Sequence, residues 1–363
     1  MTDQATVHAP GNPAGTAQGT RRPTHGFLPP VALAPGDRFP NFILPDQSGH
    51  ARSFMERARG LPMLIMADGD DAGLRSLQQA GLDSLGLDVL ALVPELPDAA
   101  TRRAEQLGIA FPLLCDSAGE IRKTLRQMMG FGAGGGFAVL LDTNQRIAGA
   151  MAGPDTTALI QWVVDRTRAM PQPEEARYLK GVAPVLLVPD VLRPEDCRAL
   201  MDRWERLGNE EGHVSSIVKG QEARRVDHEM KSRRDHRIMD EALLNELAAL
   251  IGRRIAPELN KAFGFSKFRF DRFVVTCYDS ERRDFFRRHR DNQTPGTADR
   301  RFAMTLNLNA GEYEGGGLTF PEYGPHRYDP PAGAAILFSC SLLHEALPVT
   351  KGRRFTLLNF LRA

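Results

Sequence analysis

Two histidines and one aspartate near the end of the chain are residues that could hold a metal ion. His289 and Asp291 are two positions apart, so in an extended strand both side chains leave the same face. Such a pair often arises by chance, and taken alone it is more economically a surface histidine beside a solvated aspartate. His344, which follows an apolar run, offers a third ligand. Two imidazoles and one carboxylate form the facial triad of non-haem Fe(II) oxygenases, which leaves three coordination positions open.

An arginine downstream of this triad could anchor a co-substrate. In such a site 2-oxoglutarate takes two open positions and dioxygen the third, and the distal carboxylate of 2-oxoglutarate then needs a buried cation. A guanidinium suits it because it can donate two parallel charge-assisted hydrogen bonds. Arg354 lies ten residues after His344 on the next apolar run, and Thr356 shares its face. Arg353 points to the opposite face under strand alternation.

The sequence around these positions resembles the prolyl 4-hydroxylase-type branch of the 2-oxoglutarate oxygenases. The blocks occur in that family's order and spacing, and the resemblance extends weakly back to about Val182, so it covers about half the chain. The blocks are 275–278 (Val-Thr-Cys-Tyr), 289–292 (His-Arg-Asp-Asn), 306–309 (Leu-Asn-Leu-Asn), 315–320 (Gly-Gly-Gly-Leu-Thr-Phe), 333–338 (Gly-Ala-Ala-Ile-Leu-Phe), 344–349 (His-Glu-Ala-Leu-Pro-Val) and 352–355 (Gly-Arg-Arg-Phe).

The resemblance implies a double-stranded β-helix that uses Fe(II), 2-oxoglutarate and O2, with ascorbate as a candidate additional cofactor. It further implies decarboxylation of 2-oxoglutarate to succinate coupled to hydroxylation of a C–H bond. Tyr278 stands where relatives often place a tyrosine near the co-substrate; the alternative is an aromatic residue that packs the barrel. Asn307 stands on the strand where relatives use a tyrosine to contact the distal carboxylate, so that contact is either replaced or absent here.

The pattern of apolar residues predicts two different architectures in the two halves of the chain. The first half alternates strands with helices, which predicts an α/β sheet covered on both faces; the second half has helices followed by many short strands, which predicts an α+β jelly roll. Expected strands are 63–67, 89–93, 137–142, 273–278, 302–308, 317–320, 334–338 and 354–361, and expected helices are 72–79, 99–107, 156–168, 193–207 and 240–263.

These patterns predict two domains with a tail and a linker. Residues 1–30, rich in Gly, Pro, Thr and Ala, are expected to be a disordered tail. We expect a first domain over residues 31–170 and the oxygenase domain over residues 182–363. Residues 171–181 carry prolines among charged residues, a composition typical of an exposed connection.

The first domain resembles the thioredoxin-fold redoxins of the peroxiredoxin type. The resemblance rests on residues 35–46, on Gly49, on the strand 63–67 and on residues 111–116. Redox catalysis requires an activated thiolate at the start of the helix after that strand. There the chain reads Ala-Asp-Gly-Asp-Asp-Ala over residues 67–72, without a cysteine.

Two further features indicate that this first domain is catalytically inactive. Glycines occupy residues 134–136, where thioredoxin-like proteins usually carry a cis-proline. Cys115 is the only thiol of the domain and is expected to be a small buried hydrophobe rather than a nucleophile. We therefore expect a scaffold for substrate docking or for contacts in a homodimer.

Composition excludes several classes of partner. The chain has 46 Lys and Arg against 45 Asp and Glu, so its net charge draws it neither to nucleic acid nor to a membrane surface. Its four cysteines form no CxxC pair, which argues against zinc ribbons and disulfide scaffolds and favours a reducing, cytoplasmic location. The first 30 residues lack the apolar stretch of a signal peptide or membrane anchor.

Arginines crowd the sequence around the His-x-Asp pair. The excess could bind an acidic peptide, a phosphorylated metabolite or nucleic acid, or it could be a solvated rim. Nucleic-acid demethylases of the superfamily carry a second arginine shortly after the co-substrate arginine, and no arginine lies between Arg354 and Arg362, so nucleic acid is not the expected partner. The arginines are Arg269, Arg272, Arg282, Arg283, Arg287, Arg288, Arg290, Arg300 and Arg301.

Other histidines have plainer interpretations. His326 lies between expected strands and either faces the site or belongs to a solvent-facing turn. His213, His228 and His236 lie in a charged segment, residues 213–238, that we interpret as a loop, either simply solvated or a lid over the substrate.

Three functions fit these observations. The first is hydroxylation of a protein or peptide side chain, with proline the default target by analogy; the second is oxygenation of a small metabolite; the third is a non-enzymatic binding or sensor protein. Intact ligand residues argue against the third, and the carboxylate of Asp291 argues against a halogenase. Substrate choice lies in loops and rim residues, which the triad does not specify.

Overall fold

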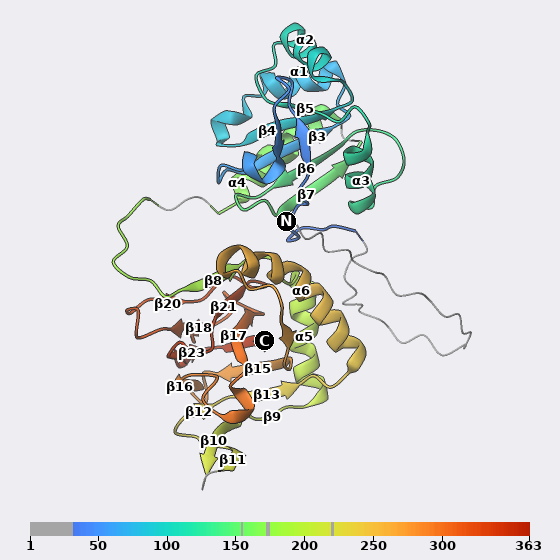
Figure 1. The fold of residues 1–363 in the computed structure, drawn as a ribbon. Helices are drawn as coiled ribbons and strands as arrows, with labels where there is room; N and C mark the ends of the chain where they lie inside the picture. The colour runs from blue at the N-terminus through green and yellow to red at the C-terminus, as the bar shows by residue number, and fades with distance from the viewer. Residues whose placement is uncertain (1–31, 154, 172–174, 219–220) are drawn as a thin grey trace, which may run out of the picture.

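The computed structural model describes residues 32–153, 155–171, 175–218 and 221–363. The tail expected over residues 1–30 lies outside these residues. The described elements form two groups, one from β1 to α4 and one from β8 to β24 (Figure 1). The linker expected over residues 171–181 falls between the two groups. No helix in the described part of the chain is both long and apolar enough to cross a membrane.

The first group is a five-stranded mixed sheet in the order β5-β4-β3-β6-β7, with helices on both faces. Strands β3, β4 and β5 run parallel, while β6 and β7 are antiparallel to their neighbours. Its elements are β1 (Ile43–Pro45), β2 (Ala51–Ser53), β3 (Met63–Ala67), α1 (Asp71–Gln79), β4 (Asp88–Val93), α2 (Pro97–Leu107), β5 (Leu113–Cys115), α3 (Glu120–Met128), β6 (Phe137–Leu141), β7 (Ile147–Ala152) and α4 (Thr156–Ala169), with short 3-10 turns Phe54–Arg57 and Leu82–Leu85.

Burial explains this arrangement. Every residue of β3 and of β6 is buried, as expected for strands in the middle of a sheet covered on both sides. Helices α1, α2 and α4 cover one face through residues such as Leu74 and Leu159, and α3 covers the other face through Leu125. The predicted α/β, thioredoxin-like architecture of the first half is confirmed.

The second group consists of two packed β-sheets with two helices outside them. Its elements are β8 (Val185–Val188), α5 (Pro194–Leu207), β9 (Glu210–Glu211), β10 (Val214–Val218), β11 (Gln221–Arg225), β12 (Lys231–Ser232), β13 (Arg234–Arg237), α6 (Glu241–Phe263), β14 (Arg269–Phe270), β15 (Val274–Asp279), β16 (Phe285–His289), β17 (Arg300–Asn307), β18 (Glu314–Gly315), β19 (Leu318–Thr319), β20 (Arg327–Tyr328), β21 (Ala335–Ser339), β22 (His344–Ala346), β23 (Val349–Lys351) and β24 (Arg353–Arg362), with a 3-10 turn Pro295–Thr297.

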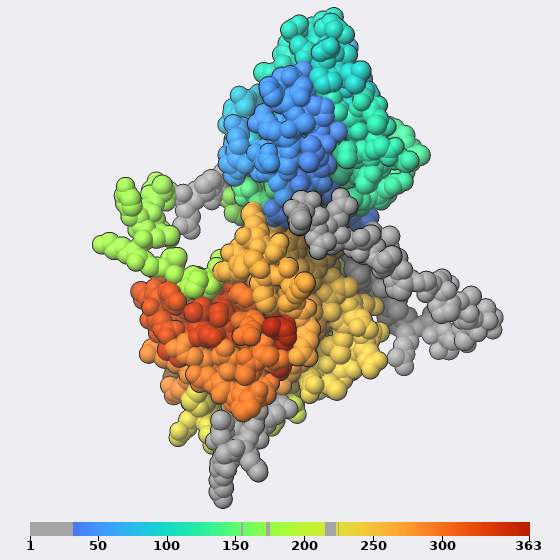
Figure 2. Space-filling model, viewed as in Figure 1, coloured from blue at the N-terminus to red at the C-terminus, as the bar shows by residue number. Residues whose placement is uncertain are grey.

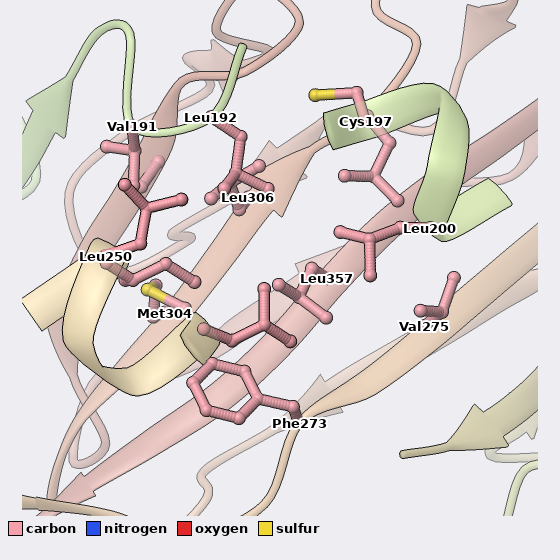
Figure 3. Close-up of a cluster of buried hydrophobic side chains, with 14 of the residues drawn as sticks. Val191, Leu192, Cys197, Leu200, Leu250, Phe273, Val275, Met304, Leu306 and Leu357 are labelled. Atoms are coloured by element: carbon pink, nitrogen blue, oxygen red, sulfur yellow. The ribbon is translucent and has the colours of Figure 1, made fainter. Parts of the chain in front are cut away.

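The larger sheet runs in the order β8-β21-β17-β24-β15-β13-β9, and the smaller one in the order β12-β16-β22-β19-β20. Helices α5 and α6 cover the outer face of the larger sheet with an apolar core that Figure 3 shows. In that core Leu200 of α5 and Leu250 of α6 lie over Leu306 of β17 and Leu357 of β24. A second cluster, which includes Tyr278, Phe320 and Phe338, is contributed by strands of both sheets. This is the double-stranded β-helix that the sequence predicted.

The interpretation of residues 213–238 as a loop was wrong in part. The segment contains the hairpin β10–β11, the short strand β12 and the strand β13. Strand β13 pairs with β15 across four residue pairs and so extends the larger sheet. Every second residue from 233 to 237 lines a polar pocket and not the core. These residues, Arg233, Asp235 and Arg237, are therefore charged instead of apolar.

The two groups contact each other through α6. Asp37, which is 1% exposed, accepts hydrogen bonds from the guanidinium groups of Arg253 and Arg254 of that helix. Arg254 also donates to the carbonyls of Asp190 and Pro35. In Figures 1 and 2 the N-terminal group meets the other group on the side where α6 lies.

Candidate active site

Strand pairing brings the three expected ligand residues together. His289, the last residue of β16, is directly opposite His344, the first residue of β22. Asp291 lies just beyond β16, where its backbone N–H donates to the carbonyl of Cys340. Its two carboxylate oxygens lie 3.4 Å from Nε2 of His289 and 3.4 Å from Nε2 of His344. One ligand atom from each residue thus falls within 4.8 Å of the others.

Hydrogen bonds at the far ring nitrogens orient both imidazoles. Nδ1 of His289 lies 2.7 Å from the carbonyl of Arg287, and Nδ1 of His344 lies 3.0 Å from the carbonyl of Leu342. A carbonyl can only accept, so each Nδ1 carries the proton and each Nε2 presents its lone pair. This is the arrangement that metal-ligating histidines usually have.

Burial and charge favour a metal-binding protonation state. Burial lowers the pKa of His344 to about 4, against the pull of Asp291, so its imidazole is neutral at neutral pH. Burial opposes ionisation of Asp291, but His344, His289 and Arg300 outweigh it and lower the pKa of that carboxyl. Two neutral imidazoles and one carboxylate fit Fe(II) and related divalent ions.

The side chain of Arg354 leaves the face of the larger sheet that is turned toward the pocket, and it lines the same pocket as the triad. It is 2% exposed, whereas Arg353 is exposed and bonds Glu205 on the opposite side, so the expected alternation is confirmed. Nη2 of Arg354 donates to Oδ1 of Asn307, and Nε donates to the hydroxyl of Tyr313. Among the described residues Nη1 has no hydrogen-bond partner, which leaves it available to a carboxylate.

Two other expected co-substrate residues also line this pocket. Thr356 is fully buried, and its Oγ1 lies 2.7 Å from Oγ1 of Thr276. The hydroxyl of Tyr278 accepts a hydrogen bond from Arg233, so its own proton remains to be donated. The guanidinium of Arg354 lies 5.6 Å from the centre of the Tyr278 ring.

The expectation for Asn307 needs correction. Asn307 does not line the pocket; it lies behind Arg354 and holds its guanidinium. Its amide nitrogen donates to Asp329 and to the carbonyl of Pro330, which fixes Oδ1 toward Arg354. These hydrogen bonds place Asn307 where it orients the guanidinium of Arg354.

Tyr313 is a member of this group that sequence reasoning missed. Its hydroxyl donates to Oδ1 of Asp329 at 2.6 Å and accepts from Nε of Arg354. Burial raises the pKa of this phenol, and Asp329 raises it further. With its one proton committed to Asp329, the hydroxyl orients Arg354. Tyr313 precedes the short strand β18, and no local periodicity marks it.

The pocket that contains these groups has a volume of about 370 Å³ and lies between the two sheets. It brings together six of the seven residues expected to bind the metal or the co-substrate, all except Asn307. His326 is exposed and does not line it, so this histidine faces solvent and not the site. Residues that line it are His289, Asp291, His344, Arg354, Thr356 and Tyr278.

In the first domain an ion-pair cluster stands where a redoxin would have its reactive thiol. Asp68, which follows β3 with a φ of 56°, pairs with Arg122 and Arg126 of α3. Arg126 also donates to the carbonyl of Gly134. Cys115 is 4% exposed, and burial raises the pKa of its thiol to about 11. The interpretation of Cys115 as a buried hydrophobe is therefore supported.

A double-stranded β-helix that presents two histidines and one carboxylate beside a buried arginine is the arrangement of a non-haem iron oxygenase. Residues 273–362 match the model of the 2OG-Fe(II) oxygenase superfamily. A PKHD-type hydroxylase of Bordetella pertussis is 28% identical over 187 residues, which cover 49% of this chain and 78% of that protein. Residues 273–362 thus carry the features of a 2OG-Fe(II) oxygenase domain.

Solved structures resemble each half separately. A prolyl-4-hydroxylase of Pseudomonas putida is 21% identical, with a TM-score of 0.38, and the match covers 50% of this chain and 92% of that one. A peroxidoxin of Mycobacterium tuberculosis is 16% identical, with a TM-score of 0.34, and the match covers 39% of this chain and 99% of that one.

Proposed function

We propose that His289, Asp291 and His344 hold Fe(II), that Arg354 anchors 2-oxoglutarate, and that the protein hydroxylates a C–H bond of a protein or peptide side chain. The observation that carries the proposal is the meeting of three ligand atoms within 4.8 Å in the pocket that Arg354 also lines. Proline is the first candidate target, by analogy with the family that the sequence resembles.

Each side chain has a defined part in this proposal. Iron, when bound, supplies the activation of O2 that couples decarboxylation of 2-oxoglutarate to succinate with oxidation of the substrate. The backbone carbonyls of Arg287 and Leu342 keep the two imidazoles in the tautomer that presents Nε2. Arg354 receives the distal carboxylate through Nη1, while Thr356 and Tyr278 offer hydroxyl groups beside it.

The form of the pocket supports a substrate larger than 2-oxoglutarate. Its lining extends from Arg354 to Val214 and Arg225, which pair with each other where the β10–β11 hairpin begins and ends. This is well beyond the residues that would hold a small co-substrate. A peptide side chain could therefore enter from this end. The curated relative is named a PKHD-type hydroxylase, which supports hydroxylation as the reaction.

The remaining expectations form part of the same proposal. The first domain serves as a scaffold for the substrate or for a homodimer, since its redox position holds an ion-pair cluster instead of a thiol. A cytoplasmic location is supported by the free state of all four cysteines. Ascorbate is proposed as an additional cofactor on the family resemblance alone.

Mass spectrometry tests the substrate class. A cell extract is incubated with the protein, Fe(II), 2-oxoglutarate and air, and the proteome and metabolite fractions are compared with those from an incubation with His344→Ala. A protein that gains one oxygen only with the wild type supports the proposal. A gain confined to a small metabolite would contradict it and favour a metabolite oxygenase.

A further inference from the structure

The pocket carries a surplus of positive charge that the proposed chemistry does not use. Its lining includes nine arginines and lysines against four acidic residues, an excess of five. Bound Fe(II) and the 2-oxoglutarate dianion would carry opposite and equal charges, so they would leave this excess unchanged. A pocket of this kind attracts a negatively charged ligand.

Several of these cations already have acidic partners. Four of the arginines each lie within 3.5 Å of a carboxylate oxygen, so the charge of each is largely balanced within the protein. The pairs are Arg225 with Asp227, Arg288 with Glu345, Arg290 with Glu322, and Arg300 with Asp271. Arg354 is reserved for the co-substrate. The surplus therefore lies elsewhere in the lining.

It lies in a group that we call the β13–β15 cation cluster: Lys231, Arg233, Arg237 and Arg272. Lys231 and Arg233 share a single carboxylate, Asp235, at 3.6 Å and 2.8 Å. The other acid on this side of the lining is the exposed Glu210. This part of the pocket lining thus has four basic residues and two acidic ones.

The cluster is arranged to receive a ligand. Arg237 is exposed to the pocket and, within the described part of the chain, makes no hydrogen bond or ion pair. Lys231 is 4% exposed and donates to the carbonyl of His213. Burial lowers the pKa of Lys231 to about 7, and nearby Arg233 and Arg272 lower it further against Asp235. Holding these cations together without an anion is electrostatically costly, and a bound carboxylate would relieve that cost.

We propose that the β13–β15 cation cluster binds a carboxylate of the substrate, so that the protein selects acidic peptides in which Glu or Asp lies near the hydroxylated residue. This inference rests on the proposed function for its peptide substrate. Arg237 is the residue at which the carboxylate would bind, because Arg233 is already held by Asp235 and Tyr278. Guanidinium groups match a carboxylate in both charge and geometry.

The test measures binding without turnover, so that it does not depend on catalysis. Three fluorescent peptides share a central proline and are flanked by Glu, by Gln or by Lys; their affinities for the metal-free protein are measured by anisotropy at low salt. The Glu peptide is expected to bind at least about tenfold more tightly than the Gln peptide, since hydrogen bonds to charged groups are the stronger kind. Equal affinities would overturn the inference.

Variants locate the effect in the cluster. Arg237→Gln should weaken binding of the Glu peptide by about tenfold and leave the Gln peptide unchanged, whereas Arg237→Lys should retain much of the preference. Arg75→Gln removes one positive charge from the exposed surface of α1 and should change nothing. A preference unaffected by Arg237→Gln would overturn the assignment, as would tighter binding of a single-stranded oligonucleotide competitor. A preserved Glu preference without any hydroxylation would contradict only the proposed function.

Discussion

At the scale of single residues, Arg353 and Arg354 show how strand alternation separates two chemically identical neighbours. The side chain of Arg354 is buried on the pocket face of the larger sheet and contacts Asn307 and Tyr313. The side chain of Arg353 lies on the opposite face and pairs with Glu205. Period-two alternation was sufficient to choose between them from the sequence. It could not show which groups hold Arg354, because Tyr313 and Asp329 come from segments without a regular pattern.

Arg354→Ala should raise the KM for 2-oxoglutarate by roughly 100-fold, because loss of a buried charge-assisted partner costs a few kcal/mol at ~1.4 kcal/mol per tenfold. Arg353→Ala should have a much smaller effect. Initial rates at varied 2-oxoglutarate test both variants, and Fe(II) binding should survive in each. The reverse order would show that Arg353 is the anchor and that the register of β24 is misassigned.

Asp329→Ala should raise the KM for 2-oxoglutarate by about fivefold while kcat changes little. The carboxylate accepts from both Asn307 and Tyr313, so its removal frees the two groups that orient Arg354 without touching the pocket. Losing the equivalent of one hydrogen bond costs about 1 kcal/mol of 2-oxoglutarate binding free energy, which corresponds to this change in KM. An unchanged KM would show that Arg354 is positioned without this network.

At the scale of elements, agreement between sequence and structure depended on how apolar each segment is. The strand predicted over residues 63–67 coincides with β3, and the helix predicted over 240–263 differs from α6 by one residue. Strands β12 and β13 were missed because their pocket-lining residues Lys231, Asp235 and Arg237 are charged instead of apolar. Helix α3 was also not assigned, since its apolar face is short between charged residues.

The start of α1 determines whether the first domain can perform thiol chemistry. Asp70 caps this helix, and Asp68 beside it is held by two arginines, so no thiolate stands there. The wild type should show no thiol-dependent peroxidase turnover, and Cys115→Ser should keep full oxygenase activity. Peroxide consumption in the presence of a dithiol reductant provides the measurement. Robust consumption that disappears in Cys115→Ser would show that the domain is an active redoxin.

At the scale of the whole molecule, buried charges join the two domains. Asp37 meets Arg253 and Arg254 of α6, and Glu258 of the same helix pairs with Arg38 at 2.8 Å. Glu258 also accepts from Asn144, so two segments of the first domain contact one face of α6. Such an interface could not be predicted from sequence, because its residues are far apart along the chain and carry no shared motif.

Asp37→Ala should therefore destabilise the docked arrangement by about 3 kcal/mol, since it leaves a buried arginine without its carboxylate. The exposed Asp83 offers a control, and Asp83→Ala should change stability by less than about 0.5 kcal/mol. Urea unfolding followed by circular dichroism measures the midpoint of the first transition. Equal midpoints for the two variants would contradict a structural role for the interface.

The tertiary arrangement explains why the triad could be predicted from the sequence and the cation cluster only in part. His289, Asp291 and His344 stand in family-like blocks. Lys231, Arg233 and Arg237 lie in a segment that resembles a loop in sequence, and only its pairing with β16 and β15 makes it part of the sheets. Of the arginines that crowd the His-x-Asp pair, Arg272, Arg288, Arg290 and Arg300 line the pocket. Pairing across the sheet, not local sequence, decides which charges face inward.

The rate of succinate formation from 2-oxoglutarate with Fe(II) in air tests the central claim most directly. Wild-type protein should convert 2-oxoglutarate, and His289→Ala, Asp291→Ala and His344→Ala should each abolish conversion, because two remaining protein ligands are too few to hold a labile ferrous ion. His326→Ala, which alters an exposed histidine outside the pocket, should keep the full rate. Succinate formation by His344→Ala at the wild-type rate would contradict the assignment of the metal centre.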